Sequence, residues 1–274
     1  MNTIGFIGGG NMAECLIGGL LASGQPASSL YVSEPDVKRR DWLSREYSIA
    51  CLADNIEVAE RADLVLFAVK PQLLQEVASP LQQAVQSRRP LIISIAAGIR
   101  STDLERWLGG ELPIVRVMPN TPALVRAGAS ALYANHMVDE QQKNQAESIL
   151  RSVGLAVWLD NEAQMDVVTA LSGSGPAYIF RVIEALEEAA SRAGLARETS
   201  RLLAIETALG AARLAVESSD SPAELRQKVT SPGGTTEQGL KKLEEGNIKQ
   251  MFQNAIDAAA ARSREMADEL GAGK

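Results

Sequence analysis

Short apolar runs alternate with longer segments of mixed polar and apolar residues over roughly the first 160 residues of the chain. This alternation predicts a parallel β-sheet whose strands are joined by crossover helices. The run 64–69 is apolar at every position, as expected for a strand that is covered on both faces. The predicted strands are residues 3–8, 30–34, 63–69, 90–96, 114–119, 129–135 and 155–160.

Beyond Asp160 the pattern becomes helical, because runs of β-branched residues end and Ala, Glu, Arg and Leu dominate. Gly194 is a predicted helix end, and Asn247 is a predicted N-cap. This change of pattern predicts an α/β domain over residues 1–161 and an all-α domain over residues 162–274. The predicted helices cover about 163–171, 174–194, 197–218, a short segment from Pro222 with Glu224 in its first turn, and 247–271.

Composition bears on how the helical half is stabilised. Apolar residues make up 46% of the chain but aromatic residues only 4%, so the core must consist mostly of Ala, Leu, Ile and Val. Helices rich in alanine bury little surface per residue, and a small helical array is marginally stable by itself. We therefore expect the helical domain to complete its core against a second copy, as a homodimer or a higher homo-oligomer.

Charge and cysteine content exclude several classes of protein. The formal net charge is −7, whereas nucleic-acid binding requires a basic face. No apolar run reaches the ~20 residues that span a bilayer, and the beginning of the sequence lacks the basic segment of a signal peptide. Cys15 and Cys51 form no disulfide framework and fit a reducing compartment. We therefore expect a cytoplasmic protein without nucleic-acid or membrane partners.

The first predicted strand leads into a glycine-rich turn, Gly8-x-Gly10-x-x-Ala13, which opens a helix. In a βαβ unit such a turn brings the backbone close to a pyrophosphate, which binds to the free N–H groups of the helix N-terminus. The alternative is a glycine-rich turn without a ligand. We predict a Rossmann-type dinucleotide-binding domain, with cofactor contacts from Ile7, Gly8, Gly10, Asn11 and Met12.

Glu34 ends the second predicted strand, where an acidic residue usually binds the ribose 2′-hydroxyl of NAD. The cations Lys38, Arg39 and Arg40 follow closely and could instead pair with the 2′-phosphate of NADP. They could equally form a solvated helix face. The sequence therefore leaves the choice between NAD(H) and NADP(H) open.

Three later loops should line the same crevice, since ligands bind at the carboxyl ends of parallel strands. The loops at 68–71, 94–98 and 118–122 are rich in small residues or contain proline. Such residues would also be expected if these loops only ended the strands and bound no ligand. The candidate cofactor contacts in them are Ala68, Val69, Lys70, Pro71, Ser94, Ala96, Ala97 and Gly98.

Acid–base groups are scarce in this sequence. The only histidine, His136, is expected on the surface of a loop, and no Cys/His cluster predicts a metal site. A nicotinamide-dependent reductase with few acid–base groups suits a preformed imine as substrate. The carbon of such an imine is already electrophilic, and its nitrogen already carries the proton. An alcohol or hydroxyacid dehydrogenase is disfavoured, because Lys70 is the only obvious acid.

The stretch TSPGGTTEQGL, residues 230–240, is a second candidate site. Gly233 and Gly234 can expose consecutive N–H groups, and Thr235 and Thr236 begin a helix whose positive end attracts anions. This loop would suit a small carboxylate, and a threonine hydroxyl can accept from an iminium N–H. The alternative is an ordinary helix N-cap after a Pro-Gly turn.

The chain resembles the pyrroline-5-carboxylate reductases over nearly its full length. The resemblance is carried by PAELRQKVTSPGGTTEQGLKKLE (222–244), RVMPNTPALV (116–125), SGSGPAY (172–178), AVKP (68–71) and SIAAG (94–98). It implies a Rossmann domain that binds NAD(P)H, a helical domain that interleaves with that of a partner, and a substrate between the nicotinamide and the loop at 230–240. The implied reaction is reduction of L-1-pyrroline-5-carboxylate to L-proline, the last step of proline biosynthesis.

The resemblance also implies roles for single residues. Gly233, Gly234, Thr235 and Thr236 would hold the substrate carboxylate, and Thr236 would also lie beside the ring nitrogen as the catalytic residue. Val229 would contact the substrate through its backbone, and Asn55 would reach the adenosine ribose. Ser172, Ser174 and Pro176 would flank the pocket. Glu34 departs from the serine that many members have near the 2′-phosphate, which puts the family's common preference for NADPH in doubt.

Two other functions fit the same sequence. One is a reductase of another cyclic imine, such as a six-membered homologue. The other is a nucleotide-binding regulator without turnover, against which the intact Thr235-Thr236 pair argues.

Overall fold

The computed structural model describes residues 2–272, which form two compact units. The first unit runs to Ser174 and also includes the chain from Asp257 onward, and the second comprises Gly175–Ile256. Residues 162–174 and the end of the last helix thus belong to the first unit, although the boundary expected from sequence assigned them to the helical domain. Among the described residues, no helix has both the length and the apolar character needed to cross a membrane.

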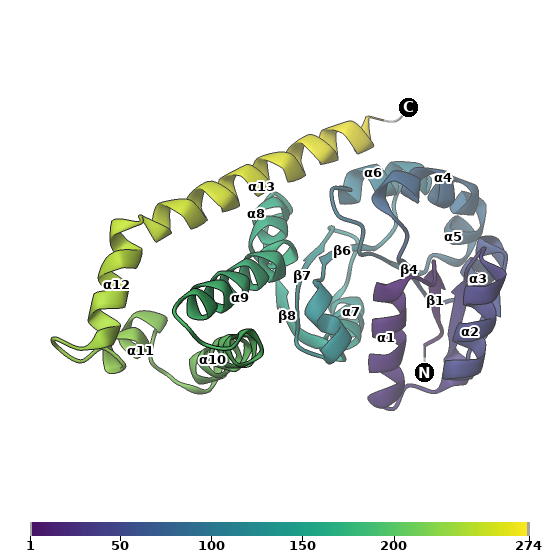
Figure 1. Cartoon of the computed structure of the whole chain (residues 1–274). Coiled ribbons are helices and arrows are strands. Elements are labelled where there is room, and N and C mark those ends of the chain that lie inside the picture. Colours follow the sequence, from purple (N-terminus) through teal and green to yellow (C-terminus); the bar gives the residue numbers. More distant parts are fainter. Residues whose placement is uncertain (1, 273–274) are drawn as a thin grey trace. The chain divides into compact units, whose positions relative to one another are not determined.

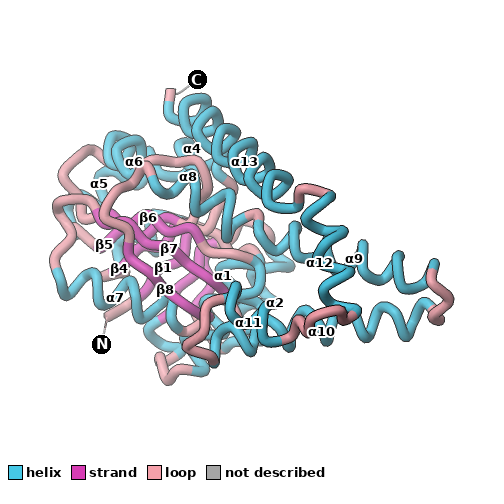
Figure 2. The backbone as a smooth tube through the Cα atoms, turned by 90° about the vertical axis from the view of Figure 1, so that its left-hand side faces the viewer, coloured by secondary structure: helices cyan, strands magenta, loops and turns pink. Residues whose placement is uncertain are grey.

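Within the described part of the first unit, eight strands form one sheet in the order β3-β2-β1-β4-β5-β6-β7-β8. Figure 2 shows the strands of this sheet in magenta with helices around them. Neighbouring strands are parallel except β6 and β7, which run antiparallel. The predicted strands are all present, whereas β3 was not predicted. The strands are β1 (Ile4–Ile7), β2 (Leu30–Ser33), β3 (Ala50–Leu52), β4 (Leu64–Phe67), β5 (Leu91–Ser94), β6 (Ile114–Met118), β7 (Gly128–Ala134) and β8 (Gly154–Trp158).

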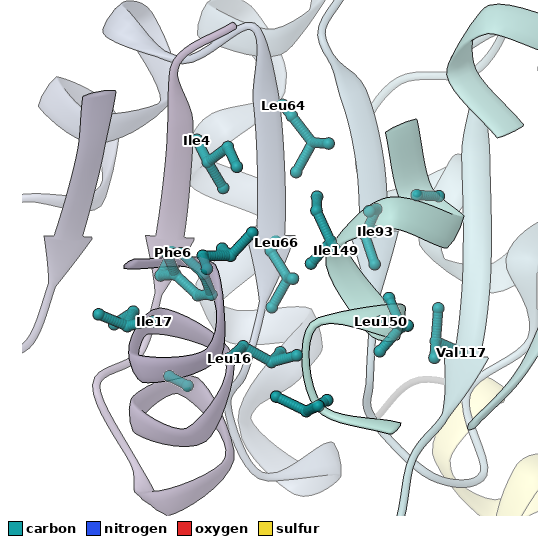
Figure 3. Packing of buried hydrophobic residues seen from close by; sticks show 14 of the residues in the cluster. Ile4, Phe6, Leu16, Ile17, Leu64, Leu66, Ile93, Val117, Ile149 and Leu150 are labelled. Atoms are coloured by element: carbon teal, nitrogen blue, oxygen red, sulfur yellow. The ribbon is translucent and has the colours of Figure 1, made fainter. Parts of the chain in front are cut away.

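Helices cover both faces of this sheet because successive strand residues point to opposite sides. Phe6 packs on one face with Leu16 of α1 and Leu150 of α7 (Figure 3), and Ile7 packs on the other face with residues of α3 to α6. The predicted α/β Rossmann fold is confirmed. The helices are α1 (Asn11–Ala22), α2 (Val37–Tyr47), α3 (Asn55–Arg61), α4 (Leu74–Ala78), α5 (Gln82–Arg88), α6 (Ser101–Trp107), α7 (Glu140–Arg151) and α8 (Gln164–Val168), with 3₁₀ turns at Ala27–Ser29, Pro71–Leu73, Ser79–Leu81 and Thr121–Val125.

The second unit is an open array of helices without a core of its own. Its longest two, α9 and α10, pack against each other as a hairpin (Figure 1). No residue of α9 is buried, and Phe180 on this helix is 66% exposed. The helices are α9 (Gly175–Arg192), α10 (Arg197–Glu217), α11 (Pro222–Lys228), α12 (Thr235–Glu245) and the first turns of α13 (Ile248–Gly271).

An apolar groove of about 750 Å³ lies among α9, α12 and α13 within this unit. Its lining includes Leu186, Leu243, Met251 and Phe252, of which Met251 is 58% exposed. So much exposed apolar surface on one helical array marks a protein–protein interface. This exposed surface agrees with the expectation that the helical half completes its core against a second copy.

The last helix, α13, belongs to both units, with its later part in the first unit. Arg100 pairs with Asp268 at 2.5 Å, and Ser263 Oγ donates to Asp166 at 2.7 Å. Arg106 donates to the Gly271 carbonyl at 2.6 Å. The end of α13 is thereby attached to α6 and α8.

Candidate functional site

The glycine turn after β1 combines one glycine that the fold requires with one that it does not. Gly8 has φ +97°, and a Cβ there would lie 2.9 Å from the Ala68 carbonyl oxygen. Its N–H donates to the Ser33 carbonyl at 2.9 Å. A Cβ on Gly10 would instead meet no atom of the described chain within 4 Å. The space beside Gly10 is therefore available to a ligand.

Gly10 is the N-cap of α1, whose first intrahelical bond runs from the Glu14 N–H to the Gly10 carbonyl at 3.0 Å. The N–H groups of Asn11 and Met12 precede that bond, and Asn11 is exposed. Ile7 is fully buried in the core, so only its backbone can face a ligand. Free donors at the positive end of a helix, next to an open glycine, fit the pyrophosphate of a dinucleotide.

At the end of β2, the Glu34 carboxylate bridges two parts of the site. Its Oε2 accepts from the Gly9 N–H at 2.9 Å, and its Oε1 accepts from the Asp36 N–H at 3.0 Å. The neighbouring cations do not form a purely solvated face, because Arg39 and Arg40 donate to the carbonyls of Gly9 and Glu34, both at 2.7 Å. Lys38 is exposed.

Other predicted cofactor contacts lie at the same edge of the sheet. Ala68, Val69 and Ala97 are half-buried, Lys70 is exposed, and Pro71 begins a 3₁₀ turn, whereas Ser94 and Ala96 are buried. Gly98 has φ +70°, which favours glycine, and a Cβ there would lie 3.3 Å from the Cβ of Met266 on α13. Asn55 opens α3 directly after β3, and Glu34 donates its N–H to Leu52 at the end of β3, at 3.0 Å. The unpredicted strand is thus what brings Asn55 to this edge.

His136 lies at the opposite edge of the sheet. Because β7 is antiparallel to β6, the end of β7 lies beside the start of β6, where Ala134 is the partner of Val115. His136 follows β7 and is exposed, as predicted. It is therefore remote from the carboxyl ends of β1, β4 and β5 within this unit.

In the loop before α12, the N–H groups of both glycines already have hydrogen-bond acceptors. Glu237 accepts from the Gly233 N–H at 2.9 Å, and the Gly234 N–H donates to the Ser231 carbonyl at 3.0 Å. The expectation that these two N–H groups are free is therefore wrong, because the loop folds onto itself and α12 supplies an acidic side chain in its first turn.

Two donors of that loop remain ahead of the first helical bond. This bond runs from the Gln238 N–H to the Gly234 carbonyl at 3.4 Å, so the N–H groups of Thr235 and Thr236 precede it. Both threonines are exposed, as is Val229, which follows α11. The N-terminus of α12 thus keeps two free N–H groups that can bind an anion, while the nearby Gly233 N–H already binds the Glu237 carboxylate.

A buried asparagine that the sequence did not single out organises residues 169–174. Thr169–Gly173 form a π-helical turn, a feature frequent at functional sites, between α8 and α9. Asn120 donates to the Ser172 carbonyl at 3.0 Å and accepts from the Ala129 N–H at 2.8 Å. A Cβ on Gly173 would lie 2.4 Å from the terminal methyl of Met118, so a side chain here requires that flexible end of Met118 to move. Asn120 thus fixes the backbone that leads to Ser174.

The two cysteines, Cys15 and Cys51, are free thiols. Burial raises the pKa of the Cys51 thiol to about 11. Burial, with a smaller contribution from the charge of Glu14, also raises the pKa of Cys15. Both groups are therefore protonated at neutral pH. Within residues 2–272, no group of His, Cys, Asp and Glu side chains is placed to hold a metal ion.

Comparison with known proteins gives two family matches in one chain. Residues 162–266 match the model described as pyrroline-5-carboxylate reductase dimerisation, and residues 3–98 match the model described as NADP oxidoreductase coenzyme F420-dependent. A pyrroline-5-carboxylate reductase of Pseudomonas aeruginosa is 48% identical and aligns over 98% of each chain.

Solved structures agree with this match over the whole chain. A pyrroline-5-carboxylate reductase of Coxiella burnetii has a TM-score of 0.94 at 47% identity, covering 97% of this chain and 98% of its own. The Plasmodium falciparum enzyme, solved with NADP bound, has a TM-score of 0.85 at 32% identity, with the same coverages of 97% and 98%.

Proposed function

The chain belongs to the pyrroline-5-carboxylate reductase family, and from this premise we propose how its own residues bind the substrate and cofactor of the reaction. The protein is an NAD(P)H-dependent oxidoreductase that acts on a C=N bond. It reduces L-1-pyrroline-5-carboxylate to L-proline, the final step of proline biosynthesis. It works as a homo-oligomer, in agreement with the dimerisation region at 162–266. We place it in the cytoplasm.

The dinucleotide is held by the turn after β1 and by the carboxyl ends of the neighbouring strands. When bound, NAD(P)H supplies the hydride that the imine carbon receives. Gly10 leaves room for the pyrophosphate, and the N–H groups of Asn11 and Met12 bind its charge. Glu34 and Asn55, at the ends of adjacent strands, bind the adenosine ribose.

The loop from Val229 to Thr236 binds the carboxylate of the substrate. The observation that carries this proposal is that the Gly233 N–H already holds a carboxylate, that of Glu237, at 2.9 Å. The substrate carboxylate joins or replaces Glu237 there and binds the N–H groups of Thr235 and Thr236. The positive end of α12 adds to this attraction.

Thr236 orients the ring nitrogen. An iminium N–H needs an acceptor, and a threonine hydroxyl provides one without removing the proton that makes the carbon electrophilic. Catalysis in such a site rests on orientation and electrostatics, with no proton donor required from the protein. The remote, exposed position of His136 in its unit agrees with this.

The function is tested by following absorbance at 340 nm with pyrroline-5-carboxylate and either NADH or NADPH. Rapid oxidation of a cofactor and formation of proline are expected. The six-membered cyclic imine serves as the competing substrate, and a higher kcat/KM on it would assign the chain to that ring instead. Dinucleotide binding without oxidation by either imine would identify a non-catalytic regulator.

Replacing the Thr236 hydroxyl by a methyl group, Thr236→Val, is expected to lower kcat by about 10-fold or more. A hydrogen bond to a charged group contributes roughly 1.5–3 kcal/mol, and 1.4 kcal/mol corresponds to a factor of ten. Thr236 is exposed, so the melting temperature should not change. Thr236→Ser should recover most of the loss, and full activity of the valine variant would remove Thr236 from the mechanism.

A further inference from the structure

We propose that Glu34 makes this chain prefer NADH to NADPH. The inference rests on the proposed function in that the dinucleotide is bound at the turn after β1. It goes further by assigning the choice between two cofactors to one side chain. Three features of the structure carry it: the position of the carboxylate, the partners of the nearby arginines, and the capping of α2.

The carboxylate lies on the glycine turn itself. Glu34 Oε2 accepts from the Gly9 N–H at 2.9 Å, and Oε1 accepts from the Asp36 N–H at 3.0 Å, so both oxygens are fixed in place. Each oxygen has a second lone pair, which a ribose hydroxyl can reach as a donor. A carboxylate held at the end of β2 is therefore ready to accept from the 2′-hydroxyl of NADH.

Arg39, whose guanidinium contacts the glycine turn, is already paired. Arg39 donates through Nε to the Gly9 carbonyl at 2.7 Å and forms an ion pair with Glu14 at 2.6 Å. Its guanidinium also lies 4.7 Å from the centre of the Trp42 ring. These contacts hold the Arg39 side chain against the turn, where it is only 26% exposed. Arg39 therefore stabilises the turn, and its guanidinium is not free to bind a phosphate.

The N-terminus of α2 is also closed to a phosphate. Its N-cap, Asp36, accepts from the Arg39 N–H at 2.7 Å, so a carboxylate occupies the positive end of the helix. Arg40 donates to the backbone carbonyl of Glu34 at 2.7 Å. A 2′-phosphate would meet the negative charges of Glu34 and Asp36 while Lys38 alone remains exposed among the three cations.

The test measures binding separately from turnover. Dissociation constants of NADH and NADPH are obtained by fluorescence titration of the native protein and of Glu34→Gln, Glu34→Ser and the matched control Glu46→Gln. Glu46 is an exposed carboxylate in the last turn of α2, the helix that follows Glu34, so its variant removes one nearby negative charge without touching the glycine turn. The kcat/KM values with both cofactors are measured in parallel.

We expect the native protein to bind NADH about 10-fold or more tighter than NADPH, because like charges a few ångströms apart repel strongly in a partly buried site. Glu34→Gln keeps an acceptor for the Gly9 N–H but not the charge, so it should reduce the preference at least several-fold. Glu34→Ser should reduce it further, and Glu46→Gln should leave it unchanged.

Binding of NADPH by the native protein as tightly as NADH, or more tightly, would overturn the proposal. An unchanged ratio of the NADH and NADPH dissociation constants in both Glu34 variants would also overturn it. A preference for NADH in binding, lost in Glu34→Ser, would uphold it even if neither cofactor were oxidised by pyrroline-5-carboxylate. That last result would contradict the proposed function alone, so the two failures are distinguishable.

Discussion

Replacing Gly10 by valine is expected to weaken binding of both NADH and NADPH by about 100-fold or more while leaving the fold intact. A Cβ at this position meets no atom of the described chain within 4 Å, so a side chain begins in open space and fills the region beside the free N–H groups of α1. The backbone could then no longer approach the pyrophosphate, which is the purpose of the second glycine in this motif.

The measurement combines a titration of both cofactors with a thermal melt of the Gly10→Val protein. Gly8→Val is the contrasting variant, because φ +97° and the carbonyl of Ala68 at 2.9 Å forbid a side chain at position 8. We expect a clearly lower melting temperature for Gly8→Val and only a small decrease for Gly10→Val, because valine is a poorer N-cap than glycine. Normal cofactor affinity in the folded Gly10→Val protein would mean that the dinucleotide binds elsewhere.

Glu162→Ala is expected to reduce the free energy of unfolding by about 3–5 kcal/mol, the range for removing one partner of a buried ion pair. Arg116, only 5% exposed, pairs with Glu162 at 3.0 Å. The same carboxylate accepts from the N–H and hydroxyl of Ser101 at 2.7 and 2.6 Å. Its loss would leave a buried guanidinium uncompensated and the first turn of α6 without its acceptor.

Denaturant unfolding at a fixed protein concentration checks this prediction, since the stability of an oligomer depends on concentration. Glu162→Gln keeps a hydrogen-bonding oxygen but loses the charge, so it should reduce the free energy of unfolding by less than Glu162→Ala does. The control is Glu140→Ala, which breaks an exposed pair with Lys143 and should cost about 1 kcal/mol or less. Similar losses for Glu162→Ala and Glu140→Ala would show that Arg116 finds another partner.

The same ion pair explains a difference between sequence and structure. The change of composition near residue 161 is real, but Glu162 is joined to the sheet through Arg116 and Ser101. Periodicity reports which positions are apolar and says nothing of such long-range pairs. Asn120 ties the following segment to the same unit through the Ser172 carbonyl, and the first unit extends to Ser174 in the structure.

Strand prediction succeeded where apolar runs were long and failed where they were short. β3 is only Ala50–Leu52, too brief for a pattern, although it positions Asn55. The antiparallel direction of β7 could not be predicted from the sequence either, because the alternation of side chains does not encode the direction of a strand. It became visible only in the pairing of Val115 with Ala134.

In the candidate site, backbone features were predictable and side-chain partners were not. The positive φ of Gly8 and the helix that starts at Gly10 follow from the glycine motif. The attachment of Arg39 to Gly9 and of Glu237 to Gly233 depends on side chains that fold back over turns. The role of Asn120 required knowledge of two segments that are distant in sequence.

The division of α13 between the two units limits how this chain can be cut into expressible fragments. A gene that stops at residue 174 encodes every described strand of the sheet but omits the part of α13 that covers Gly98 and contacts Arg100 and Asp166. Such a fragment would present an uncovered surface beside α6 and should aggregate. A nucleotide-binding module from this chain would need its final helix supplied as a separate peptide or joined by a designed linker.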